Sequence, residues 1–271
     1  MTELELVARA VDGDRSAVEA VIQRLQDPLY RLALRMVWRP ANAEDATQEI
    51  LIRIVTRLAT WRGEAQLLTW AYRIGVNYLL NLKRKTLREQ QAVSFDEFRD
   101  DLVDGLADAN RPDAELLAHE VRLTCTQSML QCLERDERIA YVLGEIFELS
   151  STDAAWILET TPAAYRKRLE RARQRVRTFT SSACGLVNPE AFCRCERRVR
   201  KALEIGRIDP AKLTLVTHEI AGRDVAEAAA ELSTLHDAAA VFRAHPDYAA
   251  PRSKMEAISE LLRSGQFSLL S

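Results

Sequence analysis

The sequence predicts an all-α protein. Apolar residues recur at intervals near 3.6 along most of the chain, which is the spacing of one face of a helix. No segment shows a convincing strand alternation of apolar and polar residues, and only 9 glycines and 8 prolines interrupt the 271 residues. The hydrophobic share of 47% can supply cores for about two domains. No repeat of fixed period stands out, so a solenoid is not expected.

The first predicted domain, residues 1–90, consists of four helices separated by clear breaks. Each break joins residues that favour turns: Asp12-Gly13-Asp14, Pro40-Ala41-Asn42 and Trp61-Arg62-Gly63. The segments between them keep the helical period and are predicted to be helices at 3–11, 15–38, 43–58 and 64–88.

Residues 91–112 are predicted to be an acidic linker. Between positions 94 and 120 the chain carries nine carboxylates against two arginines, Arg99 and Arg111. Such a shift in composition is typical of a connection between domains. The nine are Asp96, Glu97, Asp100, Asp101, Asp104, Asp108, Asp113, Glu115 and Glu120.

The second predicted domain, residues 113–182, contains a helix-turn-helix. Ser150 stands three residues before Asp153, as the N-cap of a short helix does, and Thr161-Pro162 opens the next helix after a turn. Two short helices joined in this way are the outline of a DNA-binding motif.

The second helix of this motif has a strongly basic surface. Its segment YRKRLERARQRVR, residues 165–177, holds seven cations and one carboxylate in a chain whose formal net charge is −2. The apolar members Tyr165, Leu169, Ala172 and Val176 form one stripe, which leaves the cations on the remaining surface. That surface predicts binding to a polyanion. The cations are Arg166, Lys167, Arg168, Arg171, Arg173, Arg175 and Arg177.

A polar stripe runs along the last helix of the first domain. Arg73, Asn77, Asn81 and Arg84 follow one another at spacings of four, four and three, and Lys85 adds to the basic end. Arginine contacts phosphate or guanine, and asparagine pairs with an adenine edge or holds an extruded base. On spacing alone, a solvated helix with a basic C-terminus explains the pattern equally well.

Two tryptophans, Trp61 and Trp70, bracket the loop and the start of this helix. An exposed ring there would stack on a base of separated DNA. Burial in the core is the more common role of large aromatic side chains, and the pattern favours it.

Residues 183–271 are predicted to form a helical C-terminal extension, with helices near 190–203, 210–221, 225–243 and 252–263. Its first loop holds Cys184, Cys193 and Cys195, and zinc there would need a fourth ligand. The candidates for that ligand are His218, His236 and His245.

No cofactor is expected to be required, because the cysteine spacing is not a standard zinc signature and ordinary thiols explain it better. A redox-active pair is a further alternative. Cys125 and Cys132 lie seven apart on a helical stripe with Met129 and are predicted to be core residues. Five cysteines make a disulfide framework unexpected.

No catalytic motif stands out, so an enzyme is not expected. The chain has no Gly-rich phosphate loop, no HExxH and no G-x-S-x-G, and its four histidines are scattered. Because no run of about 18 apolar residues occurs and the N-terminus is acidic and mixed, we expect a cytoplasmic protein.

Three motifs in order resemble one known family. The runs AEDATQEILIRI, WRGEAQLLTWAYRIGVNYLLNLKRK and LSSTDAAWILETTPAAYRKRLERARQRVR are similar to those of the extracytoplasmic-function sigma factors of bacterial RNA polymerase, across most of residues 1–180. The resemblance implies that core RNA polymerase and promoter DNA are partners, and that an anti-sigma or other regulatory protein is a further one.

The resemblance also implies roles for residues. Asp45, Gln48, Glu49 and Arg53 would contact the polymerase clamp helices, and the acidic linker would thread through the polymerase. The loop at 61–69, together with Asn77 and Asn81, would recognise the −10 element and capture a flipped base. The residues implied to bind DNA are Trp61, Trp70, Arg73, Asn77, Asn81, Arg84, Lys85, Arg166, Lys167, Arg168, Arg171 and Arg173.

The entry to the recognition helix departs from the family pattern. Glu159 stands in the turn, where glycine is usual, and PAAYRKR opens the helix at 162–168. The fold expectation is unaffected, but the promoter sequence that is read cannot be carried over. Arg166 and Lys167 are expected near base edges, since recognition helices read with their N-terminal residues.

The leading hypothesis is a sigma factor whose extension regulates it, by folding back on the DNA-binding parts or by contacting polymerase or a signalling partner. A stabilising helical appendage is the plainer alternative for the extension. The rival for the whole protein is a stand-alone helix-turn-helix regulator, whose C-terminal part would dimerise or bind a ligand. Such a regulator has no use for the docking helix or the asparagine stripe.

Overall fold

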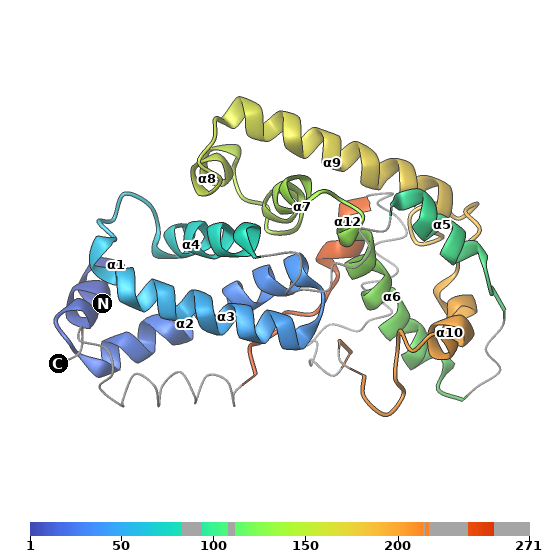
Figure 1. Cartoon of the computed structure of the whole chain (residues 1–271), viewed down its shortest axis with the longest axis horizontal. Coiled ribbons are helices and arrows are strands. Elements are labelled where there is room, and N and C mark those ends of the chain that lie inside the picture. The colour runs from blue at the N-terminus through green and yellow to red at the C-terminus, as the bar shows by residue number, and fades with distance from the viewer. Residues whose placement is uncertain (83–93, 108–111, 214, 217–237, 252–271) are drawn as a thin grey trace. The chain divides into compact units, whose positions relative to one another are not determined.

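A computed structural model confirms the all-α fold: the described part of the chain contains helices and no strand beyond one isolated bridge (Figure 1). The structure describes residues 1–82, 94–107, 112–213, 215–216 and 238–251. Within these ranges, none of the helices has the length and apolar character needed to cross a membrane.

The chain forms two compact units that do not follow the predicted boundaries. The first unit combines Met1–Arg88 with Ser150–Tyr165 and Tyr248–Ser271, and the second combines Glu89–Leu149 with Arg166–Asp247. Segments that are distant in sequence therefore share a unit, and the extension contributes to both.

The first unit begins with α1 (Glu3–Val11) and α2 (Arg15–Val37). Thr2 and Glu5 cap α1 reciprocally, because each side chain accepts a hydrogen bond from the other's backbone N–H. Asp14 caps α2 by accepting from the amides of Ser16 and Ala17 at 2.9 and 3.2 Å. Helix α1 has its predicted bounds, and α2 starts directly after the predicted turn at 12–14.

Helices α3 (Pro40–Arg57) and α4 (Leu67–Asn81), joined through the short η1 (Leu58–Thr60), pack on α2. The predicted turn at 40–42 is wrong: Pro40 is the first helical residue, a position where its missing N–H costs nothing. In α4, Gly75 allows close approach, since a Cβ there would lie 3.3 Å from Leu29 Cδ2.

The first unit also contains α8 (Ser151–Ile157) and the segment 248–251 of the extension. Tyr248 is buried, and the amide of Ala250 donates to Asp27 Oδ1 on α2 at 2.9 Å. Burial lowers the pKa of Arg35 on the same helix to about 10, and nearby Tyr248 acts in the opposite direction. This part of the extension thus belongs to the core of the first unit.

The second unit is built on α6 (Ala114–Gln131), α7 (Arg135–Tyr141) and the π-turn η2 (Val142–Ile146), with most of α9 (Pro162–Ala183). The extension adds α10 (Cys195–Glu204) and α12 (Ala238–Arg243). Tyr141 and Phe242 meet edge to face at 5.4 Å between ring centroids, which joins α7 to α12.

The predicted linker contains a helix, α5 (Phe95–Val103), which is a correction to the expected connection. Ser94 and Glu97 form a capping box that starts it. Phe95 and Phe98 lie 5.1 and 5.5 Å from the ring of Phe179 on α9. The acidic segment is therefore docked by aromatic packing at its apolar positions.

The extension helices differ from their predicted ranges. The helix predicted at 190–203 begins at Cys195, and the described residues of 210–216 are not helical. Of the helix predicted at 225–243, only α12 is described, and the helix predicted at 252–263 lies outside the described residues.

Candidate nucleic-acid interface

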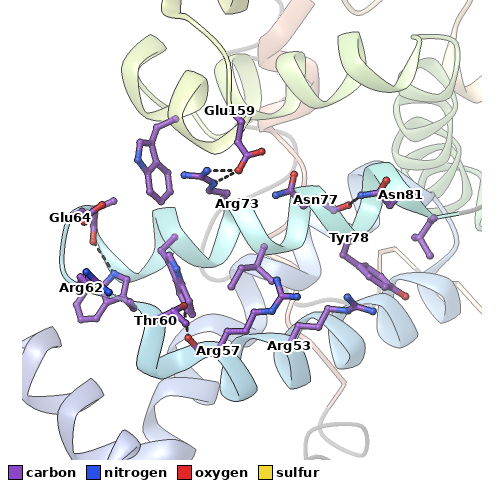
Figure 2. A pocket seen from close by; sticks show the side chains of 16 residues that line it. Arg53, Arg57, Thr60, Arg62, Glu64, Arg73, Asn77, Tyr78, Asn81 and Glu159 are labelled. Carbon is purple, nitrogen blue, oxygen red and sulfur yellow. Dashed lines mark hydrogen bonds and ion pairs between the residues drawn. The ribbon is translucent and has the colours of Figure 1, made fainter.

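A groove of about 820 Å³ in the first unit collects most of the residues predicted to bind the −10 element (Figure 2). It lies along α3 and α4. Trp156 of α8 and Glu159 of the turn after α8 also line it. Its lining residues are Arg53, Arg57, Thr60, Trp61, Arg62, Glu64, Ala65, Trp70, Arg73, Ile74, Asn77, Tyr78, Asn81, Leu82, Trp156 and Glu159.

The polar stripe of α4 faces this groove, as the spacing predicted. Arg73, Asn77 and Asn81 all line it, and both asparagines are exposed. The amide Nδ2 of Asn81 donates to the carbonyl oxygen of Asn77 at 2.7 Å (Figure 2). Asn77 presents its whole side-chain amide, which has both a donor and an acceptor for a base edge.

Two apolar residues of α4 also belong to the groove. Leu67 and Ala71 are buried, whereas Ile74 and Tyr78 are half-exposed and line it. The guanidinium of Arg53 lies 5.0 Å from the centre of the Tyr78 ring. Burial and nearby Glu49 raise the pKa of Tyr78, so its hydroxyl is a neutral donor at neutral pH.

The loop before α4 is held from inside the unit. The ring of Trp61 is only 8% exposed, and its Nε1 donates to the carbonyl of Ala65 at 3.0 Å. Glu3 accepts from the amide of Leu67 at 3.0 Å. Trp61 is therefore buried, as the sequence pattern favoured, and its stacking on a base stays a prediction. Trp70 is half-exposed and lines the groove.

Arg73 is engaged by the helix-turn-helix. Its Nε donates to Glu159 Oε1 at 2.9 Å, a second nitrogen bonds to the same oxygen, and its guanidinium lies 4.6 Å from the centre of the Trp156 ring (Figure 2). Sequence reasoning missed Trp156 and Glu159, because 86 residues separate Arg73 from Glu159 and no local pattern links them.

Two further cations of the groove, Arg57 and Arg62, are exposed and were also missed. The sequence did offer an indication of both, since Arg57 precedes the loop that contains Trp61 and Arg62 follows Trp61 within it. Four arginines line the groove together with two asparagines, which gives it the composition of a site for a phosphate backbone and its bases.

The predicted polymerase-docking residues lie together on α3. Asp45 is exposed, and Gln48 and Glu49 are half-exposed. Arg53 donates to Glu49 Oε1 at 3.0 Å, one helical turn away. The structure therefore places all four residues on one helix and pairs two of them.

Both helices of the helix-turn-helix begin where the sequence predicted. Ser150 Oγ accepts from the amide of Asp153 at 3.0 Å, which caps α8, and α9 starts at Pro162. Glu159 takes φ +51° in the turn, a left-handed conformation that glycine would adopt without strain. The substitution of the usual glycine thus leaves the turn intact.

The cations of α9 divide into two groups. Arg166 and Lys167 are exposed, and within the described residues no carboxylate pairs with either. Three others predicted to bind DNA are already paired with carboxylates of the second unit: Arg168 with Asp136 at 3.3 Å, Arg171 with Glu137 at 3.3 Å and Arg173 with Glu145 at 2.6 Å. Arg166 and Lys167 are therefore exposed without such a pair, and DNA binding by the three paired arginines stays a prediction.

The remaining predicted residues have mixed outcomes. Arg84, Lys85, His218 and His236 lie outside the described residues. His245 is buried, and its Nε2 forms a hydrogen bond with Thr126 Oγ1, so it is not directed at the cysteine loop. Cys132 is buried, which confirms its predicted core position.

Comparison with known proteins agrees with the motif order. The model of Sigma-70 region 2 matches residues 21–89, and that of Sigma-70 region 4 matches residues 123–176. The chain is 30% identical over 180 residues to the ECF RNA polymerase sigma-E factor of Haemophilus influenzae, which covers 65% of this chain and 94% of that protein.

A second curated relative and one solved structure are also similar to part of the chain. The RNA polymerase sigma-H factor of Pseudomonas aeruginosa is 29% identical over 177 residues, covering 64% of this chain and 90% of that protein. The solved structure of CnrH in complex with the cytosolic domain of CnrY matches with a TM-score of 0.45 and 20% identity, covering 63% of this chain and 91% of that one.

Proposed function

Because the chain belongs to the extracytoplasmic-function family of RNA polymerase sigma factors, we propose that the groove of its first unit captures the −10 strand during promoter melting. The observation that carries this proposal is the convergence of Asn77, Asn81 and Trp70 with the groove's arginines on one surface. Amides read a base edge, a ring stacks on it, and guanidinium groups neutralise the phosphates.

The remaining parts take complementary roles in this proposal. Arg166 and Lys167, at the start of α9, read the −35 element, and the α3 face with Asp45, Gln48 and Glu49 docks on core polymerase. The protein carries out no chemical step itself, and it acts in the cytoplasm, where the polymerase transcribes. A stand-alone helix-turn-helix regulator would explain the match to region 4, but it would not explain the match to region 2.

Removing one groove amide should impair melting more than duplex binding. We expect Asn77→Ala to reduce open-complex formation by about 5- to 100-fold, which corresponds to about 1–3 kcal/mol of base recognition. Electrophoretic mobility of the closed complex would measure duplex binding, and permanganate reactivity of thymines would measure melting.

The same measurements on Asn81→Ala test the second amide, and Gln23→Ala is the matched control, since it removes an exposed amide of α2 outside the groove. If Asn77→Ala weakened duplex binding and melting by equal factors, a base-capture role for the groove would be refuted.

In this conformation the groove is partly occupied by the protein itself. The carboxylate of Glu159 and the ring of Trp156 contact Arg73, and both residues line the groove. We therefore propose that α8 and its turn must leave α4 before the groove accepts DNA. Glu159 supplies the negative charge that the phosphate would later replace.

Neutralising Glu159 should favour the open groove. We expect Glu159→Gln to raise run-off transcription by about 2- to 5-fold at limiting protein, since an exposed ion pair contributes about 1 kcal/mol or less. Glu64→Gln removes the same charge from an exposed position of the same groove, and serves as the control. An equal gain in the two variants would attribute the effect to general charge and contradict a closing contact.

A further inference from the structure

The cysteine loop of the extension and helix α6 meet at one small cavity. Cys184, Cys193 and Cys195 line it from the loop, and Cys125 lines it from the middle of α6. Its volume is about 90 Å³, which has room for an ion and is much smaller than a site for an organic cofactor. Four cysteines from two segments that are distant in sequence therefore line the same space.

The loop that carries three of these thiols is ordered by its own backbone. Cys184 and Cys193 form an isolated parallel bridge, in which Gly185 N donates to Cys193 O at 3.0 Å and Cys193 N donates to Ala183 O at 3.1 Å. A Cβ at Gly185 would lie 2.6 Å from the carbonyl oxygen of Cys193. The two bridged segments therefore approach more closely than a residue larger than glycine would permit.

Arg194 stabilises the same loop by donating to the carbonyls of Ala191, Cys193 and Pro189. The backbone amides of Leu186 and Val187 hydrogen-bond to Cys184. Amide donors directed at a sulfur atom stabilise its thiolate form, which is the form that binds metal. The backbone of the loop thus already directs two donors at Cys184 before any ion binds.

We propose that Cys125, Cys184, Cys193 and Cys195 form a structural site for a thiophilic divalent cation, with zinc as the fitting ion. Four thiolates complete a tetrahedral zinc shell and leave no open position, which is the composition of a closed, structural site. On binding, each thiol releases its proton to solvent and its Sγ forms one bond to the cation. The site joins the extension to α6.

The surrounding charges favour this arrangement. A zinc ion with four thiolates carries a net charge of −2, and two cations, Arg122 and Arg194, line the same cavity against one carboxylate, Glu196. Each thiol must lose its proton to bind the cation, so metal affinity should fall as the pH is lowered.

Among the described residues, no three side chains already stand in a coordination set. A cysteine side chain has a single torsion, χ1, so its sulfur moves by rotation without a change in the backbone. Metal binding in this proposal is such a rotation of sulfur atoms that already border one cavity. His245, whose ring bonds to Thr126, is not needed as the fourth ligand.

Metal analysis of the full-length protein tests the proposal. Protein purified under reducing conditions should hold about one zinc per chain. Cobalt replacement should give the visible bands of a tetrahedral site, with a sulfur-to-cobalt charge-transfer intensity of four thiolates. Absence of bound zinc, together with no cobalt spectrum after metal addition, would overturn it.

Single substitutions test whether Cys125 is a ligand or whether the loop cysteines bind the metal without it. Cys125→Ser should lower the metal content and the charge-transfer intensity as Cys193→Ser does. Cys132→Ser is the control on the same helix, since its thiol bonds to Ser128 O at 3.5 Å and does not line the cavity. If Cys125→Ser kept the full metal content and spectrum, Cys125 would not be a ligand. If a variant fails to fold, the charge-transfer intensity of the cobalt-loaded unsubstituted chain still measures how many thiolates bind the metal.

Discussion

A chain that ends at Ser182 is expected to lose the packing of its second unit. The apolar face of α6, with Leu117 and Val121, is buried against Val199 of α10 and Ile208 of the extension. Exposing Leu117 and Val121 alone would cost about 3–6 kcal/mol, a large share of the 5–15 kcal/mol by which domains are usually stable. Urea unfolding followed by circular dichroism should show a lower midpoint and a broader transition.

This outcome bears on the role of the extension. If the shortened chain unfolded cooperatively at an unchanged midpoint and supported more run-off transcription, the extension would be an inhibitory appendage and the packing argument would fail. A point change in the full chain provides a second test: Val199→Asp should reproduce much of the loss. Arg200→Ala, one residue away on the exposed face of α10, should have little effect.

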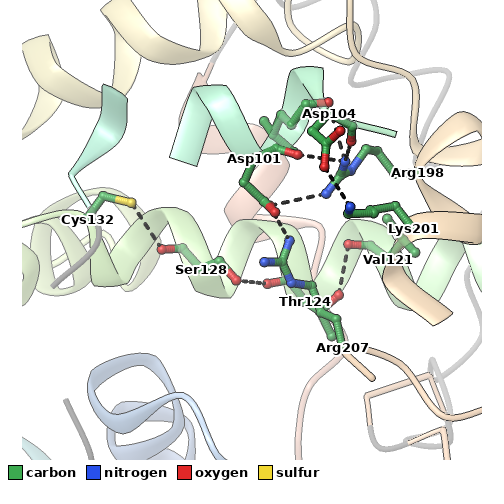
Figure 3. A network of polar contacts seen from close by, with 10 residues as sticks. Asp101, Asp104, Val121, Thr124, Ser128, Cys132, Arg198, Lys201 and Arg207 are labelled. Atoms are coloured by element: carbon green, nitrogen blue, oxygen red, sulfur yellow. Dashed lines mark hydrogen bonds and ion pairs between the residues drawn. The ribbon is translucent and has the colours of Figure 1, made fainter. Parts of the chain in front are cut away.

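Replacing Arg198 by alanine is expected to lower the free energy of unfolding by about 2–4 kcal/mol. Arg198 is only 2% exposed, and one of its nitrogens donates to the backbone carbonyls of Asp101 and Asp104 at 2.8 and 2.6 Å, at the end of α5 (Figure 3). Its other nitrogen donates to Asp101 Oδ2 at 3.1 Å. The alanine variant would leave these acceptors without their donor.

The geometry of the guanidinium should matter as well as its charge. Arg198→Lys keeps the charge but loses the planar set of donors, so it should recover only part of the stability. Lys201→Ala is the control, because its ion pair with Asp104 is exposed and should contribute little (Figure 3). Equal unfolding midpoints for Arg198→Ala and the unsubstituted chain would show that the end of α5 needs no donor from the extension.

The same contacts have a consequence for the acidic segment. Asp101 is bound by Arg198 and Arg207, and Asp104 by Lys201, all three from the extension. Hydrogen bonding to Lys201 lowers the pKa of Asp104. A linker that threads through polymerase must first release these cations, so we expect a free sigma factor to hold this segment until polymerase competes for it.

Local patterns were enough for most helices and for half of the groove. The starts of α2, α8 and α9 followed from capping residues and turn residues that act within a few positions. Arg73, Asn77 and Asn81 face one groove because a helix brings positions four apart onto one side. The helix in the acidic segment was not predicted although Ser94 and Glu97 form a capping box, because the many carboxylates around it are typical of a linker.

The sequence by itself determined the helical fold, the order of the two DNA-binding parts and the basic recognition helix, since each depends on interactions between near neighbours. Only the tertiary structure decided which cations remain exposed, what covers Arg73 and that Cys125 lines the same cavity as the cysteine loop. These depend on contacts between residues such as Arg198 and Asp101, 97 positions apart. Such pairs leave no periodic trace in the sequence, because their proximity arises only when separate helices pack.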